Sequence, residues 1–279
     1  MTAQFCFYPA ARSRAGGLTG TAVLILLFYA FAREIAPLAR RIKPRRAIDD
    51  PFLRGFRAQL GATEIVAIAT GMGFARAQRA ARRALDLFPA AEIVIGTGVA
   101  GALSSGLGEG DLILADRIVA TRGGASDHIA TIDSATLDEL GGYLRLAGIG
   151  YSTGAILTSH RVLGTGAEKR AANQVTGAIA VDMETAALAI EARERGLRFA
   201  ALRAVMDTVD DDVVGAEMAD ENGAVRPLTA ANFLMRNPSV MIRLPRMMRS
   251  LGRATRSIAA ALEAIASRGA APATRRRRG

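Results

Sequence analysis

The sequence is poor in the residues that build disulfide frameworks and metal sites. Its 279 residues include a single cysteine, Cys6, and two histidines, His128 and His160. One cysteine excludes a disulfide framework within the chain and a cysteine-based metal site, and the two histidines lack the spacing of metal ligands. Since no other pattern implies an organic cofactor, the sequence predicts no metal ion and no cofactor.

Long apolar runs are also missing. The run at residues 21–32 is shorter than the roughly 20 residues that a transmembrane helix needs. It follows Arg12 and Arg14, as the apolar part of a signal peptide would, but it leads into Arg33 and Glu34 without a small-residue cleavage pattern. We therefore predict a buried strand at residues 23–28, preceded by a dispensable, disordered extension at residues 1–20.

Acidic residues do not balance the basic ones, and the net charge is +10. Much of the excess is local, because four arginines form the run 275–278 and five more lie between residues 243 and 256. This distribution argues against a nucleic-acid-binding surface and for one basic patch. We expect no nucleic-acid partner, and a disordered basic tail at residues 269–279.

What the chain does contain is a series of short apolar runs, typical of buried strands in a parallel sheet. Helical patterns separate several of them, which predicts an α/β fold with a mostly parallel, twisted central sheet flanked by helices. The expected strands are 23–28, 64–69, 92–95, 112–115, 154–157 and 199–205, and the expected helices are 34–41, 76–87 and 183–195.

Suggestive residues follow four of these strands. Glu34 follows the first, Gly71 and Gly73 follow the second, residues 96–101 extend the third, and Asp207 follows the last. In such sheets ligands bind beyond the carboxyl ends of the strands. The four strand ends are therefore expected to meet at one crevice.

Two segments carry acids suited to nucleoside chemistry. In Val181-Asp-Met-Glu-Thr-Ala-Ala-Leu-Ala, Glu184 near a helix start can accept hydrogen bonds from both vicinal hydroxyls of a ribose, or simply interact with the helix dipole. In Leu202-Arg-Ala-Val-Met-Asp-Thr-Val-Asp, Asp207 ends an apolar strand. A partly buried Asp there could protonate N7 of a departing purine, whereas acids 210–212 suit a solvated loop.

Together these two segments resemble the paired signature of the methylthioadenosine/S-adenosylhomocysteine nucleosidase and purine nucleoside phosphorylase superfamily. Ile95-Gly-Thr-Gly-Val-Ala-Gly-Ala-Leu resembles the glycine-rich strand end of that family, and Ala30-Phe-Ala-Arg-Glu-Ile resembles its first-strand exit. The similarity runs from about residue 21 to about residue 212, in the family's order. The resemblance implies a purine nucleosidase or nucleoside phosphorylase domain at residues 21–218, in a homo-oligomer.

The resemblance also implies roles for single residues. Glu34 is the expected base that activates water, and Asp207 the expected acid. Six residues are expected to contact substrate at the ribose, nucleophile or purine pockets: Met183, Glu184, Arg203, Thr97, Gly98 and Val162.

Three positions depart from the family pattern. Val99 and Met206 stand where serine is common, and Val162 stands where an aromatic residue often covers the purine. The pocket is therefore expected to be less polar and less aromatic than usual, which argues against ordinary methylthioadenosine as the substrate.

Residues 219–268 form a separate C-terminal segment with a basic amphipathic pattern. Apolar residues from Val240 to Ile265 share one helical face, and Arg243, Arg246, Arg249, Arg253 and Arg256 lie on the opposite one. The helix could pack on the domain with solvated arginines, or lie on an anionic membrane. The segment resembles the hopanoid-associated branch of the family, which implies release of adenine from adenosylhopane at the inner face of the membrane, by a cytoplasmic protein.

Four functions remain as alternatives at this point. Glu34 favours hydrolysis, whereas Arg33, Arg76 and Arg203 could hold phosphate for a phosphorylase reaction. A non-catalytic membrane-binding relative is disfavoured by the joint presence of the acidic residues. A nicotinamide oxidoreductase is suggested only by the glycine pattern of residues 96–101, which follows the third strand and opens no clear helix.

Overall fold

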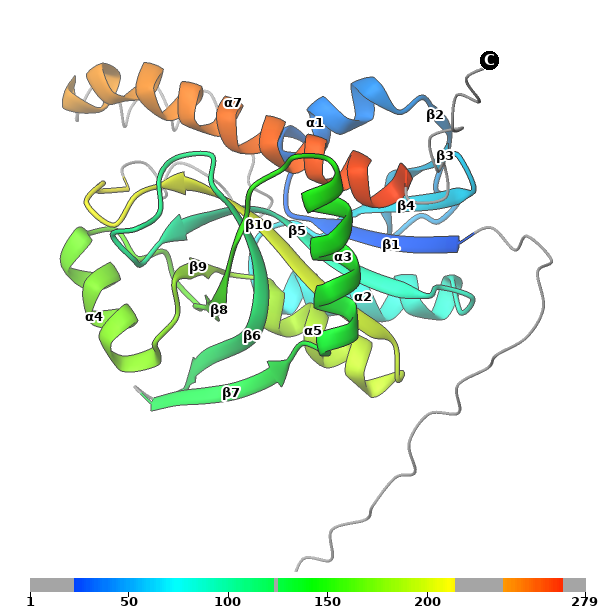
Figure 1. Ribbon diagram of the computed structural model, residues 1–279, viewed down its shortest axis with the longest axis horizontal. Helices are drawn as coiled ribbons and strands as arrows, with labels where there is room; N and C mark the ends of the chain where they lie inside the picture. The colour runs from blue at the N-terminus through cyan, green and yellow to red at the C-terminus, as the bar shows by residue number, and fades with distance from the viewer. Residues whose placement is uncertain (1–22, 123–124, 214–237, 268–279) are drawn as a thin grey trace, which may run out of the picture.

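The computed structural model describes residues 23–122, 125–213 and 238–267. Cys6, the predicted extension 1–20, the boundary at residues 218/219 and the basic tail lie outside these ranges. Figure 1 shows the arrangement of the elements. In chain order they are β1 (Val23–Tyr29), α1 (Ala32–Arg41), β2 (Pro44–Ala47), β3 (Arg54–Leu60), β4 (Thr63–Ala69), α2 (Phe74–Leu87), β5 (Ile93–Ala102), β6 (Leu112–Arg122), β7 (Ala125–Thr131), α3 (Ser134–Leu146), β8 (Ser152–Thr158), α4 (Gly166–Thr176), β9 (Ala180–Asp182), α5 (Thr185–Glu194), β10 (Arg198–Asp207) and α7 (Pro238–Ala266).

The centre of the sheet consists of four parallel strands in the order β4, β1, β5 and β10. All seven residues of β1 are apolar, and five of them are buried. Apolar residues on both faces are needed because helices cover the sheet on both sides. The predicted α/β fold class is confirmed, and all six predicted strands and all three predicted helices are present with shifted ends.

Further pairings, some antiparallel and some parallel, extend this parallel centre on both sides. On one side β3 pairs with β4, and β2 pairs with β3. On the other side the pairings β5–β9, β9–β8, β8–β6, β6–β10 and β10–β5 close a ring of five strands. The carboxyl ends of β4, β1, β5 and β10 therefore lie side by side, as the sequence predicts.

Two helical layers complete the core. Residues of α1, α3 and α7 pack on one face of the sheet in a single apolar cluster, and residues of α2 and α5 pack on the other. Figure 1 shows α7 running along the same side of the sheet as α1.

Helix α7 is continuous through Pro245. Its apolar residues Ala254, Ile258, Leu262 and Ile265 are buried in that shared cluster, where α7 packs on α1 and β10. For this half of the helix, packing on the domain is confirmed and the idea that its apolar face lies on lipid is wrong. No helix within the described ranges is both long enough and apolar enough to cross a bilayer.

Candidate active site

Glu34 lies just beyond the carboxyl end of β1, in the first turn of α1, and is only 2% exposed. Its Oε2 accepts the backbone N–H groups of Ala30 at 2.7 Å and Phe31 at 3.0 Å, and its Oε1 accepts that of Val99 at 2.9 Å. Burial raises the pKa of Glu34, and the Arg203 guanidinium and the three backbone N–H groups lower it in part. A carboxyl group balanced in this way can take a proton from a bound water molecule.

Gly98 on β5 allows Glu34 and Arg203 to meet. Its φ of +137° disfavours any residue with a side chain. A Cβ atom at this position would lie 2.5 Å from Glu34 Oε1 and 2.6 Å from Arg203 Nη1. The backbone of Gly98 therefore approaches the candidate base closely.

Arg203 on β10 is 1% exposed, and protein groups occupy its guanidinium. Nη1 donates to the Thr97 carbonyl at 2.6 Å, and Nη2 donates to Thr185 Oγ1 at 2.8 Å and forms an ion pair with Asp182 Oδ2 at 2.6 Å. A buried charge is tolerated when it is paired and hydrogen-bonded in this way. Arg203 thus acts as a fixed positive charge beside Glu34.

Glu184 is the N-cap residue of α5 and is 6% exposed. Its Oε1 accepts the backbone N–H of Gly73 at 2.7 Å, which links α5 to the loop after β4. Burial, followed by the neighbouring Asp182 carboxylate, raises the pKa of Glu184 to about 7, against the lowering effect of Arg203. Since a carboxylate can accept about four hydrogen bonds, Glu184 retains capacity for hydroxyl donors.

The other three residues predicted to contact substrate differ in their surroundings. The Thr97 hydroxyl donates to the Leu202 carbonyl at 3.0 Å, so Thr97 is engaged inside the sheet. Met183 is half-buried between Asp182 and Glu184. Val162 is half-buried in the loop before α4, and it is not among the residues that line the cavity beside Asp207.

Asp207, the last residue of β10, forms the other end of the candidate site. Its Oδ2 accepts a short hydrogen bond from the Lys169 ammonium group. Burial raises the pKa of Asp207, Lys169 lowers it, and Asp211 raises it slightly. A Cβ atom on Gly101 of β5 would lie 2.9 Å from Asp207 Oδ2, so a second glycine of β5 makes room for a carboxylate.

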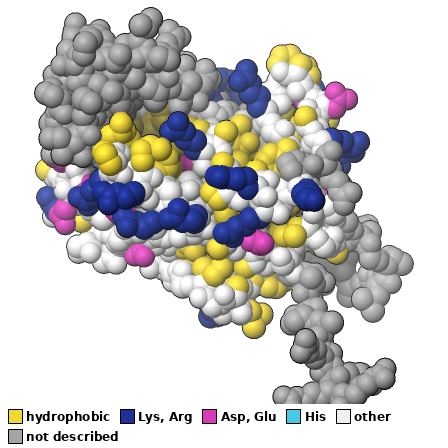
Figure 2. Space-filling model, turned by 90° about the horizontal axis from the view of Figure 1, so that it is seen from above, with side chains coloured by type: hydrophobic (Ala, Val, Ile, Leu, Met, Phe, Trp, Pro, Cys, Tyr) yellow, Lys and Arg dark blue, Asp and Glu magenta, His cyan; other side chains and the backbone are white. Residues whose placement is uncertain are grey.

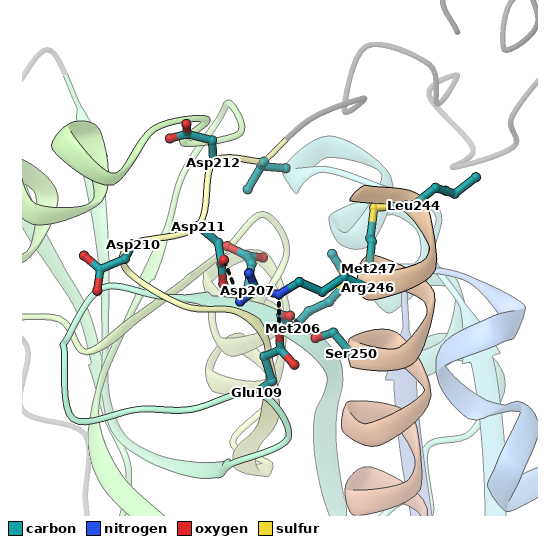
Figure 3. A pocket seen from close by; sticks show the side chains of 11 residues that line it. Glu109, Met206, Asp207, Asp210, Asp211, Asp212, Leu244, Arg246, Met247 and Ser250 are labelled. Atoms are coloured by element: carbon teal, nitrogen blue, oxygen red, sulfur yellow. Dashed lines mark hydrogen bonds and ion pairs between the residues drawn. The ribbon is translucent and has the colours of Figure 1, made fainter. Parts of the chain in front are cut away.

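A cavity of about 300 Å³ opens beside Asp207. Figure 3 shows Asp207 in it, with Met247 and Ser250 facing it from α7. Arg246 closes one side, because its guanidinium pairs with Glu109 at 3.3 Å and Asp211 at 2.9 Å. The lining residues are Glu109, Met206, Asp207, Asp210, Asp211, Asp212, Val213, Leu244, Arg246, Met247 and Ser250.

Strand β5 passes both Glu34 and Asp207, the two ends of the candidate site. Gly98 contacts Glu34, and Gly101 contacts Asp207. Three residues of strand span about 10 Å. The candidate base and the candidate acid thus approach the same strand at points about 10 Å apart along it.

Sequence reasoning missed two charged residues of this arrangement. Asp182 stands in the motif that drew attention to Glu184, and its pairing with Arg203 depends on β9 and β10 folding together. Lys169 lies in α4, a helix that the sequence analysis did not predict. A signal was present, because Thr165 and Glu168 form the capping box that starts this helix.

Comparisons with known proteins point to one superfamily. The profile of the phosphorylase superfamily matches residues 25–235. A futalosine hydrolase from Acidothermus cellulolyticus is 36% identical over 132 residues, covering 42% of this chain and 54% of that protein. The chain thus matches about half the length of this curated relative.

Solved structures show the same fold at low identity. The 5′-methylthioadenosine/S-adenosylhomocysteine nucleosidase of Helicobacter pylori superposes with a TM-score of 0.65 at 16% identity, covering 87% of this chain and 98% of that one. The futalosine hydrolase of Helicobacter pylori gives a TM-score of 0.65 at 16% identity, covering 88% and 99%. The matching profile covers most of the chain, and the protein belongs to the phosphorylase superfamily.

Proposed function

We propose that the protein hydrolyses the N-glycosidic bond of a purine nucleoside. The observation that carries this proposal is the placement of Glu34 against Gly98 and of Asp207 against Gly101 on the same strand. Burial raises the pKa of both carboxyl groups, which suits groups that gain and lose protons during the reaction. The similar proteins include hydrolases of nucleosides, which supports the same reaction class.

The reaction needs one proton delivered and one removed. Protonated Asp207 donates its proton to N7 of the purine while the bond between C1′ and N9 breaks. Glu34 accepts a proton from the water molecule whose oxygen forms the new bond to C1′. Glu184 accepts hydrogen bonds from the ribose hydroxyls, and the products are the free purine and the sugar with a hydroxyl group on C1′.

Phosphorolysis is the second candidate, and the surroundings of Arg203 argue against it. Its guanidinium is already bonded to Asp182, Thr185 and Thr97. A phosphate beside it would also face the carboxyl groups of Glu34 and Glu184, which repel an anion. Water meets no such repulsion.

The test is release of the purine, measured by chromatography with and without phosphate. Asp207→Asn and Glu34→Gln should each lower kcat by about 10²–10⁴, the usual effect of removing a positioned acid or base. Asp138→Asn, a change of an exposed acid on α3, serves as the control and should retain full activity. Near-normal turnover in Asp207→Asn contradicts the assignment, and strict dependence on phosphate establishes phosphorolysis instead.

For the substrate we propose a 5′-substituted adenosine, namely adenosylhopane, as the resemblance to the hopanoid-associated branch implies. The apolar side chains of Met206, Leu244 and Met247 beside Asp207 support an apolar substituent. Adenine release from adenosylhopane should exceed that from methylthioadenosine in parallel assays at equal concentration. Preference for methylthioadenosine, or release of purine from futalosine alone, contradicts this choice.

We further propose that α7 contacts an anionic membrane through arginine side chains. Figure 2, seen from the side of α7, shows a row of basic side chains on this face. Arg249 and Arg256 are exposed and have no acidic partner in the described ranges, whereas Arg246 and Arg253 pair with Glu109. The side chain of Arg243 lies outside the described residues.

Sedimentation with phosphatidylglycerol vesicles tests this contact. Each basic residue near an anionic surface contributes about 1 kcal/mol, so Arg249→Gln with Arg256→Gln should weaken binding about 30-fold at low salt. Arg79→Gln with Arg193→Gln removes the same charge from exposed positions on α2 and α5, the opposite helical layer, and should retain binding. Equal losses of vesicle binding in both double variants contradict a specific binding surface.

The expected homo-oligomer is tested by light scattering.

A further inference from the structure

Lys169 is a buried charged side chain that the proposed reaction has not yet used. It lies in the second turn of α4 and has no exposed surface. Burial of an ammonium group is costly unless strong partners compensate it. A lysine without solvent contact beside the candidate acid therefore needs an explanation.

The partners of Lys169 all belong to one short stretch, residues 207–211. Its ammonium group donates to Asp207 Oδ2, to the Thr208 carbonyl at 2.7 Å and to the Asp211 carbonyl at 2.8 Å. These three acceptors match the three N–H donors of a protonated lysine. The Asp211 side chain closes the same turn, since its Oδ2 accepts the Thr208 N–H at 2.9 Å.

This arrangement distinguishes the two oxygens of Asp207. Oδ2 is held by the Lys169 ammonium group and occupies the space that a Cβ atom on Gly101 would fill. The Asp207 side chain retains 18% exposure and lines the cavity. Because Oδ2 is occupied by a donor, a proton carried by Asp207 resides on Oδ1.

We propose that Lys169 is a positioning residue, which fixes Asp207 by Oδ2 so that Oδ1 delivers the proton to the purine, and whose charge stabilises the carboxylate left behind. The inference rests on the proposed function. In the proton-transfer step the O–H bond at Oδ1 breaks, the N7–H bond forms, and Lys169 keeps its own proton throughout. A fixed positive charge beside the developing carboxylate lowers the barrier in the manner of other preorganised electrostatic groups.

The charged groups near Asp207 affect its ionisation in different directions. Asp211 opposes ionisation of Asp207, and Arg246 on α7 is paired with Asp211 and with Glu109. Lys169 from α4 is the cation that contacts the Asp207 carboxylate directly. Removing Lys169 and removing Asp211 should therefore shift the pH dependence of the reaction in opposite directions.

The experiment compares pH profiles of kcat and KM in the full chain. Turnover needs protonated Asp207, so kcat falls as the pH rises through the pKa of Asp207. Removing an opposite charge at this range raises a carboxyl pKa by about 1–3 units. Lys169→Met should therefore move the falling limb to higher pH by at least about one unit and lower kcat about tenfold or more, with little change in KM.

Two further variants separate charge from packing. Lys169→Arg keeps the charge and should keep the limb near its wild-type position. Asp211→Asn removes a neighbouring negative charge and should move the limb to lower pH. A Lys169→Met enzyme with the wild-type limb and kcat overturns the proposal, and so does a limb displaced to lower pH.

Breaking a buried pair is strongly destabilising, and a Lys169→Met chain can fail to fold for that reason. In that case ¹⁵N NMR of the wild-type protein decides. The Lys169 ammonium resonance should change with the same pH midpoint as kcat, and a resonance without that midpoint overturns the proposal. A wild-type protein that releases no purine at any pH refutes the proposed function instead, which keeps the two failures distinct.

Discussion

Replacement of Gly98 by alanine tests the geometry of the site at its tightest point. A Cβ atom there would lie 2.5 Å from Glu34 Oε1 and 2.6 Å from Arg203 Nη1, both belonging to buried side chains. Neither side chain can retreat freely. Glu34 is held by three backbone N–H groups, and Arg203 is held by Asp182 and Thr97.

The expected loss of stability has two parts. A side chain at a φ of +137° costs about 1–3 kcal/mol in backbone strain. Forcing extra volume into a packed site costs about 1–3 kcal/mol more. The sum, about 2–6 kcal/mol, corresponds to a decrease in Tm of at least about 4 °C, since 1 kcal/mol shifts Tm by about 2–4 °C in a domain of this size.

Scanning calorimetry and purine release measure the two consequences of Gly98→Ala. Gly177→Ala is the matched control for strain alone, because Gly177 has a φ of +65° and no atom within 4 Å of a built Cβ. It should lose about 1–2 kcal/mol and retain activity. Gly98→Ala should lose more stability and lower kcat by about 10² or more, because Glu34 is displaced. Equal Tm values for the two variants, with full activity in both, refute the reasoning.

Three further predictions concern burial of charge and packing. The folded-state pKa of Glu184 is raised to about 7 from 4.5, so the stability that protonated Glu184 contributes below pH 4.5 is lost as the pH rises through 7. In urea titrations, Glu184→Gln should therefore reduce the loss of stability between pH 5 and pH 8 by up to about 3 kcal/mol. Arg203→Gln should cost about 3–5 kcal/mol, because it leaves Asp182 buried without its cation, and adding Asp182→Asn should recover part of that loss. Leu262 is 3% exposed, and Leu262→Ala should lower the unfolding free energy by about 2–5 kcal/mol. Met248 is 43% exposed, and Met248→Ala should change it by less than about 0.5 kcal/mol. Equal effects of the two changes would contradict the packing of α7.

Elements with both faces buried were predictable from the sequence, and edge elements were not. The buried strand β1 is an uninterrupted apolar run, which periodicity identifies directly. Strand β3 contains Arg54 and Arg57 and is only partly covered, because it lies near the sheet edge, so its composition resembles a loop. Helix α4 buries only Gly166 and Lys169, too little for an apolar stripe.

The site was predictable where it depends on the positions of strand ends. It was unpredictable where it depends on which buried side chains pair with one another. Glu34 and Asp207 follow parallel strands, and a common crevice at such strand ends is a general rule. The partner of Arg203 could not be read from the sequence, which suggested phosphate as one option. Whether a buried arginine binds a ligand or an internal carboxylate depends on Asp182, 21 positions earlier, reaching it across the fold.

The glycines of β5 illustrate how one pattern serves a different physical purpose from the one its letters suggest. Gly96, Gly98 and Gly101 have the spacing of a dinucleotide fingerprint, in which a helix N-terminus binds phosphate. In the structure all three lie within a strand, and no helix opens at Gly101. Each instead makes room for a side chain: Leu188 of α5 at Gly96, Glu34 and Arg203 at Gly98, and Asp207 at Gly101. The absent Cβ atoms thus let two carboxyl groups approach one strand from neighbouring elements, at two positions that are three residues apart in the sequence.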